Sequence, residues 1–224
     1  MAINLQTTQG LSAQGVNILV YGHAGSGKTS LIKTLPNPVV LSAEGGLLSI
    51  SDTATPFVEV TDMPTLIEAL EWAKGSGEAQ KFDSFALDSI SEIAEVVLAH
   101  EKSEAKDPRQ AYGALQDAMA YIVRAFRDLP KHVYFTAKCE KTADETGRLL
   151  YAPAMPGNKL AQSLPYFFDE VLAMRVERDE DGTTQRALLT SSDGLWQAKD
   201  RSGRLDAWEP ADLGEIIGKI GGAR

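Results

Sequence analysis

The stretch Gly22-His23-Ala24-Gly25-Ser26-Gly27-Lys28-Thr29 decides the fold of this chain. It follows an apolar run that ends at Tyr21, as expected of a buried strand, and it leads into a helix-like run from Ser30. The spacing G-x-x-x-x-G-K-[ST] is that of a P-loop, in which glycines let the backbone curl so that successive N–H groups point at phosphate oxygens. Because the motif lies between a predicted strand and a predicted helix, a chance glycine-rich turn is the weaker interpretation.

A P-loop predicts a site for the phosphates of a nucleotide such as ATP, together with Mg²⁺. The helix that begins at its end adds the positive end of its dipole. Lys28 is placed to reach the β- and γ-phosphates, and the Thr29 hydroxyl is placed to coordinate Mg²⁺. The predicted nucleotide-binding residues are Gly22, His23, Ala24, Gly25, Ser26, Gly27, Lys28, Thr29 and Ser30.

The length and composition are those of one ordinary globular domain. The chain has 224 residues, which we divide into an N-terminal arm over 1–15 and a single domain over 16–224. Cys139 is the only cysteine, so neither an intramolecular disulfide nor a cysteine-rich zinc site can form. The sequence shows no apolar run long enough for a membrane span and no secretory leader, so we expect a cytoplasmic protein without membrane contact. The net charge of −9 argues against a uniformly basic surface but leaves room for a local basic groove.

Two acids follow predicted strands downstream of the P-loop. Glu44 comes directly after the apolar run 39–43 and before two glycines, where open α/β sheets place their active sites; an exposed loop glutamate is the alternative. Asp88 ends the apolar strand predicted over 82–88, which is the Walker B pattern of an Mg²⁺-binding aspartate. Thr136 and Lys138 end the next buried strand and are weaker candidates for sensing the γ-phosphate.

The remaining pattern predicts an α/β fold, with a mainly parallel central sheet flanked by helices and a C-terminal antiparallel hairpin. Helices are expected over 63–72, 90–100, 114–129 and 211–220, with a charged break over 101–109 and a long irregular segment over 138–164. The hairpin is expected to pair 169–176 with 185–190 across the acidic turn at 179–182.

A second basic element follows the hairpin. Lys199 and Arg201 stand at i and i+2 at the end of an apolar strand, so their side chains share one side and can be aimed at one phosphate. A solvated basic strand end is the alternative interpretation.

The order of these signals resembles the ATPase core of RecA-type recombinases. In that family a catalytic glutamate follows the strand after the P-loop, and the resemblance implies that Glu44 activates the attacking water. The run Ala198-Lys199-Asp200-Arg201-Ser202-Gly203 resembles the Lys-x-Arg element of RadA-like recombinases and DnaB-like helicases, whose cations reach the γ-phosphate bound by a neighbouring subunit. The catalytic residues implied are thus Glu44, Lys28, Lys199 and Arg201, with the last two acting in trans in a homo-oligomer.

Over nearly all of 16–210 the chain looks like the short phage RecA-like proteins of the Sak-type single-strand annealing group, often labelled phage ATP-binding proteins. The resemblance includes Asp107-Pro108-Arg109-Gln110-Ala111-Tyr112-Gly113 and Lys159-Leu160 before Leu164-Pro165. It implies a phage or prophage protein that acts in the bacterial cytoplasm on single-stranded DNA, with a single-strand binding protein as a further partner. The chain departs from full recombinases in lacking their extra terminal domains, so the resemblance does not carry strand exchange over to it, whereas annealing or loading of DNA is compatible with it; the sequence alone does not decide between annealing and exchange.

RecA-like cores bind single-stranded DNA through two loops, which correspond here to about 100–113 and 138–164. Cations interleaved with aromatic residues suit a contact that follows the backbone and stacks on bases, whereas solvated charges offset by neighbouring acids are the alternative for each residue. The candidate DNA-binding residues are Lys102, Lys106, Arg109, Tyr112, Lys138, Lys141, Arg148 and Lys159.

Two other functions stay open at the level of sequence. A P-loop phosphotransferase is disfavoured because the chain shows no arginine-rich lid and because such an enzyme gives Lys199 and Arg201 no clear task. An ATP-dependent switch or interaction protein without DNA binding is the other alternative.

Overall fold

The computed structural model describes residues 15–143, 146–178 and 181–221. The arm predicted over 1–15 therefore lies outside the described residues except for Gly15, and so does part of the turn predicted over 179–182. Among the described residues, no helix is both long enough and apolar enough to cross a membrane.

A nine-stranded sheet forms the centre of the structure, in the order β11-β9-β8-β1-β5-β4-β2-β3, with β10 also pairing with β8. The strands from β8 to β3 in that order run parallel, while β9 and β10 run antiparallel to β8. The bounds are β1 Asn17–Tyr21, β2 Pro38–Ser42, β3 Phe57–Glu59, β4 Ser84–Asp88, β5 His132–Ala137, β8 Glu170–Arg178, β9 Thr184–Leu189, β10 Lys199–Asp200 and β11 Trp208–Pro210.

This sheet confirms the predicted fold class, a mainly parallel α/β sheet with a C-terminal antiparallel hairpin, which is the pair β8 and β9. The central strands β1 and β4 are buried along their whole length. Strands that are covered on both faces read as continuous apolar runs rather than as alternating ones, and this is why the sequence identified them.

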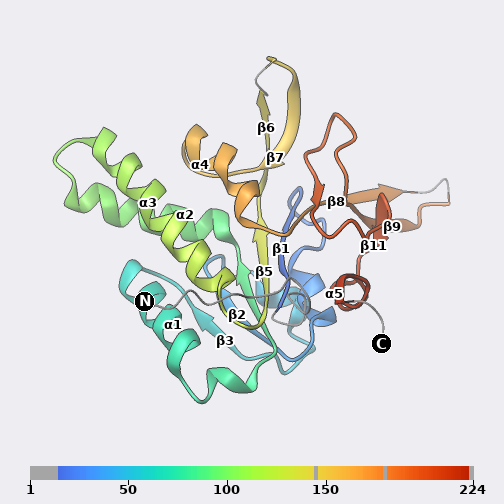
Figure 1. Ribbon diagram of the computed structural model, residues 1–224, viewed down its shortest axis with the longest axis horizontal. Helices are drawn as coiled ribbons and strands as arrows, with labels where there is room; N and C mark the ends of the chain where they lie inside the picture. Colours follow the sequence, from blue (N-terminus) through green and yellow to red (C-terminus); the bar gives the residue numbers. More distant parts are fainter. Residues whose placement is uncertain (1–14, 144–145, 179–180, 222–224) are drawn as a thin grey trace, which may run out of the picture.

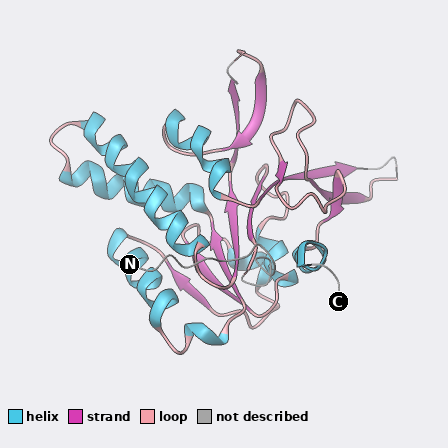
Figure 2. Ribbon diagram, viewed as in Figure 1, coloured by secondary structure: helices cyan, strands magenta, loops and turns pink. Residues whose placement is uncertain are grey.

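Two apolar layers cover the sheet, and alternate residues of β1 belong to opposite layers. Leu19 and Tyr21 pack with the helices α1 (Met63–Gly75), α2 (Ile90–Glu104) and α3 (Pro108–Arg127). Ile18 and Val20 pack with the 3₁₀ helix η2 (Thr29–Thr34) and with α5 (Leu213–Gly221). Figures 1 and 2 show the long helices α2 and α3 gathered on one side of the sheet and α5 on the other.

The helix ends follow ordinary capping chemistry. Asp62, Ser89 and Asp107 each accept a backbone N–H at the start of α1, α2 and α3, respectively. The remaining short helices are η3 (Leu47–Ile50), η4 (Ala79–Lys81), α4 (Asn158–Ser163) and η5 (Leu164–Phe167).

The prediction of an irregular segment over 138–164 is wrong. It contains an antiparallel hairpin of β6 (Cys139–Ala143) and β7 (Leu149–Pro153), followed by α4, and the hairpin projects from the sheet in Figure 1. The hairpin forms a separate two-stranded sheet, in which β6 is mostly polar and the apolar run of β7 is short and ends at Pro153, so neither strand has the signal of a core strand. Pro153 is tolerated because it lies at the end of an edge strand.

Two smaller expectations also need correction. The charged break predicted over 101–109 is shorter, because α2 continues to Glu104 and α3 begins at Pro108. Glu and Lys are good helix formers, which explains why charge alone does not end α2. The helix after the P-loop is a single 3₁₀ helix, η2, rather than an α-helix.

Candidate functional site

The P-loop lies between the end of β1 and the start of η2, at the edge of the sheet where the parallel strands end. Lys28 Nζ donates to the carbonyls of Gly22 at 2.9 Å and His23 at 3.1 Å, so the lysine folds back over the loop. Gly25 and Gly27 have φ angles of +74° and +107°, which only glycine adopts without strain. The loop therefore has the curled backbone that a phosphate cradle needs.

Asp88 joins the P-loop to two neighbouring strands. Thr29 Oγ1 donates to Asp88 Oδ2 at 2.7 Å, and the Thr136 hydroxyl from β5 donates to Asp88 Oδ1. The backbone N–H of Ala43, just after β2, donates to the Asp88 carbonyl at 2.8 Å. The predicted pair of Thr29 and Asp88 thus lies in direct contact. Thr136 was expected as a sensor of the γ-phosphate, but in the structure its hydroxyl is engaged by Asp88.

The donor set at Asp88 fits Mg²⁺. A hydroxyl and a carboxylate are the hard oxygen ligands that Mg²⁺ takes, and Mg²⁺ at nucleotide sites completes its shell with phosphate oxygens and water. No cluster of three or more His, Cys, Asp or Glu residues suited to a metal occurs within the described ranges, so the protein ligands would be Thr29 and Asp88.

Burial shifts the pKa values of both central charges. Burial raises the pKa of Asp88, although the hydrogen bonds from Thr136 and Thr29 oppose that rise. Burial likewise lowers the pKa of Lys28, against the nearby negative charges of Glu44 and Asp88. Each group would gain from a bound partner of opposite charge, because such a partner stabilises its ionised form.

Glu44 lies beside Asp88 at the ends of β2 and β4. Ser89 Oγ donates to Glu44 Oε1 at 2.6 Å, which orients the carboxylate, while the side chain as a whole stays exposed. A carboxylate that is held from one side and open on the other can accept a proton from a water molecule.

Lys138 lies near this edge but is paired. Its Nζ forms an ion pair with Glu92 on α2, so it is not free for a phosphate in this structure. The prediction that Lys138 senses the γ-phosphate or binds DNA therefore requires this pair to open.

An aromatic cluster of His23, Tyr151 and Trp196 connects the P-loop to the β6–β7 hairpin. The Tyr151 and Trp196 rings stack with their centroids 4.3 Å apart, and the His23 ring stands edge-on to both at 5.4 Å. Two backbone hydrogen bonds, from Tyr151 N to the Leu195 carbonyl and from Gln197 N to the Tyr151 carbonyl, fix this arrangement. No sequence motif marks this cluster, because its members are far apart along the chain.

Three of the candidate DNA-binding residues line a groove of about 570 Å³ between α3 and the segment 156–160, and a fourth, Lys102, contacts one of them. Arg109 and Tyr112 on α3 line one wall and Lys159 on α4 lines the other, while Lys102 Nζ lies 5.5 Å from the centroid of the Tyr112 ring. Gly157 lies beside the Tyr112 ring, and its φ of +88° is a backbone conformation that favours glycine. The other four candidates, Lys106, Lys138, Lys141 and Arg148, do not line this groove.

Lys141 and Arg148 belong to the hairpin region instead. Lys141 Nζ lies 5.1 Å from the centroid of the Tyr151 ring, and the Arg148 guanidinium donates to the Gly194 carbonyl. Lys141 therefore packs across the two strands of the hairpin, and Arg148 holds the hairpin to the segment at Gly194. Lys106 is exposed in the short break between α2 and α3.

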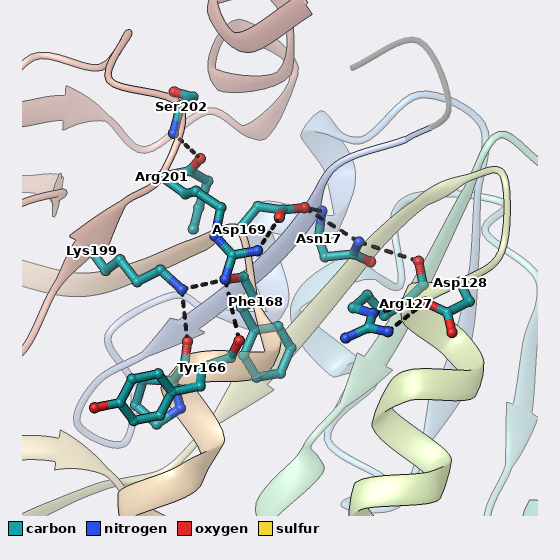
Figure 3. Close-up of polar contacts among 11 residues, drawn as sticks. Asn17, Arg127, Asp128, Tyr166, Phe168, Asp169, Lys199, Arg201 and Ser202 are labelled. Atoms are coloured by element: carbon teal, nitrogen blue, oxygen red, sulfur yellow. Dashed lines mark hydrogen bonds and ion pairs between the residues drawn. The ribbon is translucent and has the colours of Figure 1, made fainter. Parts of the chain in front are cut away.

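Lys199 and Arg201 lie at the other edge of the sheet, where the parallel strands begin. Lys199 Nζ donates to the carbonyls of Pro165 and Phe168 at 3.0 and 2.6 Å, and Arg201 forms an ion pair with Asp169 at 2.9 Å (Figure 3). Because a strand rises about 3.3 Å per residue, the length of β1 separates these cations from the P-loop of their own chain. Both cations are engaged by their own chain in this structure, so their expected contact with a phosphate of a neighbouring copy stays a prediction.

Asp200, between these two cations, faces the buried Glu170 across the β10–β8 pair. Glu170 is fully buried, and its Oε2 has no hydrogen-bond partner among the described residues, while Oε1 accepts from Ser202 N at 3.3 Å. Burial and then the neighbouring negative charge of Asp200 raise the pKa of Glu170 to about 8. The strand that carries Lys199 and Arg201 is thus anchored on a carboxyl that is neutral at physiological pH.

Replacement of Glu170 by glutamine should flatten the dependence of stability on pH. The folded pKa of about 8 lies above the ordinary value of 4.5, so the folded protein holds a proton that the unfolded chain releases in this window. The stabilising contribution of Glu170 to the free energy of unfolding is therefore complete below pH 4.5. It is lost as the pH rises from 4.5 to about 8. Urea unfolding from about pH 5 to about pH 9 measures this slope.

The matched control is Glu177→Gln, an exposed glutamate on the same strand, which should leave the slope unchanged. A Glu170→Gln protein whose stability falls with pH as steeply as that of the wild type would contradict the assigned pKa.

Comparison with known proteins agrees with this geometry. A search of curated proteins gives no match. Among solved structures, the chain is similar to the KaiC-like protein PH0186 from the hyperthermophilic archaeon Pyrococcus horikoshii OT3, at 13% sequence identity and a TM-score of 0.40, over 78% of this chain and 77% of that one. A likeness at that TM-score carries no argument about function.

The comparison with protein families identifies the family of this chain. The family model described as AAA domain (AAA_24) matches residues 14–202, which include the P-loop, Glu44, Asp88 and the strand with Lys199 and Arg201. The match thus spans most of the chain and every element of the nucleotide site described above. The chain therefore belongs to this AAA family of P-loop ATPase domains.

Proposed function

We propose that this protein is a Mg²⁺- and ATP-dependent single-stranded DNA-binding ATPase that acts in phage recombination, by annealing, in the bacterial cytoplasm. The observation that carries the proposal is the groove at α3 and α4, because it joins parts of the two segments expected to bind DNA. A single-strand binding protein is the further partner that the resemblance to Sak-type proteins suggests.

The groove has the chemistry of a single-strand site. Arg109, Lys159 and Lys102 supply positive charge, and Tyr112 is 44% exposed, so part of its ring is open for a base to stack on. Stacking on an aromatic ring is tolerant of sequence, and cations that follow the phosphates supply most of the affinity. The chain as a whole has a net charge of −9, so this cluster of positive charge stands out locally on an acidic protein.

The aromatic cluster supports coupling between nucleotide and DNA. His23 belongs to the P-loop, and Tyr151 belongs to the hairpin that leads into the groove segment 156–160. A shift of the P-loop backbone when a triphosphate binds would move the His23 ring, and its edge-on contacts would pass that movement to the hairpin. This gives the proposal a physical route from one site to the other.

For the ATPase reaction, we assign the chemistry to the residues at the strand ends. Lys28 and the P-loop N–H groups hold the phosphates, and Thr29 with Asp88 would hold Mg²⁺, which supplies charge stabilisation when bound. Glu44, oriented by Ser89, accepts the proton of the attacking water.

Replacement of Glu44 by glutamine should preserve ATP binding but lower the hydrolysis rate about 100-fold or more, because the amide cannot accept the proton. Phosphate release measures the rate, and binding of a fluorescent ATP analogue measures the affinity. Lys28→Ala should lose nucleotide-dependent activity, whereas Glu95→Gln, an exposed glutamate on α2, should behave as wild type. Full turnover by Glu44→Gln would place the base elsewhere.

Lys199 and Arg201 are proposed to act on the γ-phosphate held by a neighbouring copy of the chain. Their position at the edge opposite the P-loop is compatible with action in trans and prevents action in cis. In the single chain both cations bind their own backbone and Asp169, so assembly must exchange these contacts for phosphate oxygens.

Arg201→Ala should lower hydrolysis by about 1,000-fold if Arg201 stabilises the transition state as an arginine finger does. Mixing this variant with Lys28→Ala should restore part of the activity, since one copy then offers an intact P-loop and the other an intact finger. Mixtures no more active than either variant alone would count against a finger in trans.

Arg109→Ala and Lys159→Ala should each weaken binding of a single-stranded oligonucleotide and reduce the slope of log K against log salt by about 0.7, the value for one lost phosphate contact. Tyr112→Leu should cost about 1–3 kcal/mol with little change in that slope. Fluorescence anisotropy at several salt concentrations separates the two effects.

Lys81→Ala is the matched control for these variants, since Lys81 is an exposed cation before β4, at the other edge of the sheet. If all three groove variants bind DNA as the wild type does, the groove is not the DNA site. Oligomerisation with ATP and no binding of DNA would favour the ATP-dependent switch.

A further inference from the structure

Arg186 on β9 lies against the P-loop although it belongs to no motif that the sequence revealed. β1 ends at Tyr21, which pairs with Ala173, whereas β8 continues beyond that point to Arg178. The β8–β9 hairpin therefore extends past the end of β1 and runs beside the P-loop, where Arg186 pairs with Val176.

The contact between Arg186 and the P-loop is close and specific. Arg186 Nε donates to the carbonyl of Ser26 at 3.0 Å. A Cβ placed on Gly27 would lie 3.1 Å from Arg186 Nε and 3.2 Å from its Cδ, so the side chain packs directly on that glycine. This contact is a second reason, besides a φ angle of +107°, why position 27 suits glycine.

Most of the hydrogen-bonding capacity of Arg186 is unused. A guanidinium has five N–H donors, and Nε–H engages Ser26; the two terminal nitrogens have no partner within the described parts of the chain. The side chain is exposed. Arg175 and Arg201, by contrast, are committed to ion pairs with Asp193 and Asp169.

Positive charge at the phosphate cradle is otherwise scarce. Among the described Lys and Arg side chains, only Lys28 and Arg186 donate hydrogen bonds to the backbone of the P-loop. Lys138, the next cation near this edge, is paired with Glu92. A triphosphate bound here would thus meet Arg186 as the one further cation of the same chain that is already held against the loop.

We propose that Arg186 is a second phosphate-binding cation of the nucleotide site, supplied by the same chain. Nε–H anchors the side chain on the Ser26 carbonyl, and the terminal amino groups bind oxygens of the polyphosphate chain. The planar guanidinium matches two phosphate oxygens at once, and anchoring it in advance reduces the entropy lost when the ligand binds. The ligand class is therefore the polyphosphate rather than the base. This inference rests on nucleotide binding by the P-loop and is independent of DNA.

The test compares Arg186→Gln and Arg186→Lys with the wild type by calorimetric titration with ATP and with inorganic triphosphate. The glutamine can still donate a hydrogen bond but has no charge, so both ligands should bind about tenfold or more weakly. The lysine keeps the charge but loses the fork, and its affinities should fall between those of the other two proteins. Arg178→Gln, an exposed arginine on the same hairpin, is the matched control and should bind both ligands normally.

Four results would overturn the inference. Binding of both ligands by Arg186→Gln as tight as by the wild type would leave the P-loop site intact and remove Arg186 from it. A loss for ATP without a loss for inorganic triphosphate would assign Arg186 to the nucleoside instead of the phosphates. A wild-type protein that binds neither ligand would overturn both this inference and the proposed function. Equal loss in Arg186→Gln and Arg186→Lys, with normal thermal unfolding, would show that shape rather than charge matters and would also contradict the assignment.

Discussion

The buried carboxylate of Asp88 is the constraint on which the candidate site depends. It accepts hydroxyl hydrogen bonds from the P-loop residue Thr29 and from Thr136 on β5, and its backbone carbonyl accepts the N–H of Ala43 after β2. One residue thus ties together the ends of three strands and the phosphate cradle. A buried carboxylate is costly unless it is paired, so these contacts fix the relative positions of the groups that must meet a nucleotide.

Two pairs of cationic side chains lie at opposite edges of the sheet. Lys28 and Arg186 lie at the edge where the parallel strands end, whereas Lys199 and Arg201 lie at the edge where they begin. A single chain cannot bring both sets to one phosphate. Under the proposed action in trans, the complete site forms only where two copies meet, and the buried Glu170 behind β10, whose pKa is raised, contacts the strand that carries the second set.

The sequence predicted the parts of this structure that have a local cause. The P-loop, the strand ending in Asp88 and the position of Glu44 each follow from an apolar run that leads into a polar strand end. The hairpin of β6 and β7 escaped prediction because it lies outside the central sheet, where its strands are held by each other and by Trp196. Arg186 and His23 acquire their contacts only through the fold, because their partners lie far away in sequence. The groove is lined by three of the candidate DNA-binding residues, with Lys102 against the Tyr112 ring, whereas Lys138 and Arg148 are engaged elsewhere.

The central claim is that nucleotide controls binding of single-stranded DNA. Its most direct test is the binding of a fluorescent single-stranded oligonucleotide to the wild-type protein, with and without ATP and Mg²⁺, across a range of salt concentrations. The account predicts binding that strengthens with ATP and Mg²⁺ and weakens as salt rises. No binding in any nucleotide state, at low salt and with ATP shown to be bound, would contradict it and leave a P-loop ATPase whose partner is not DNA.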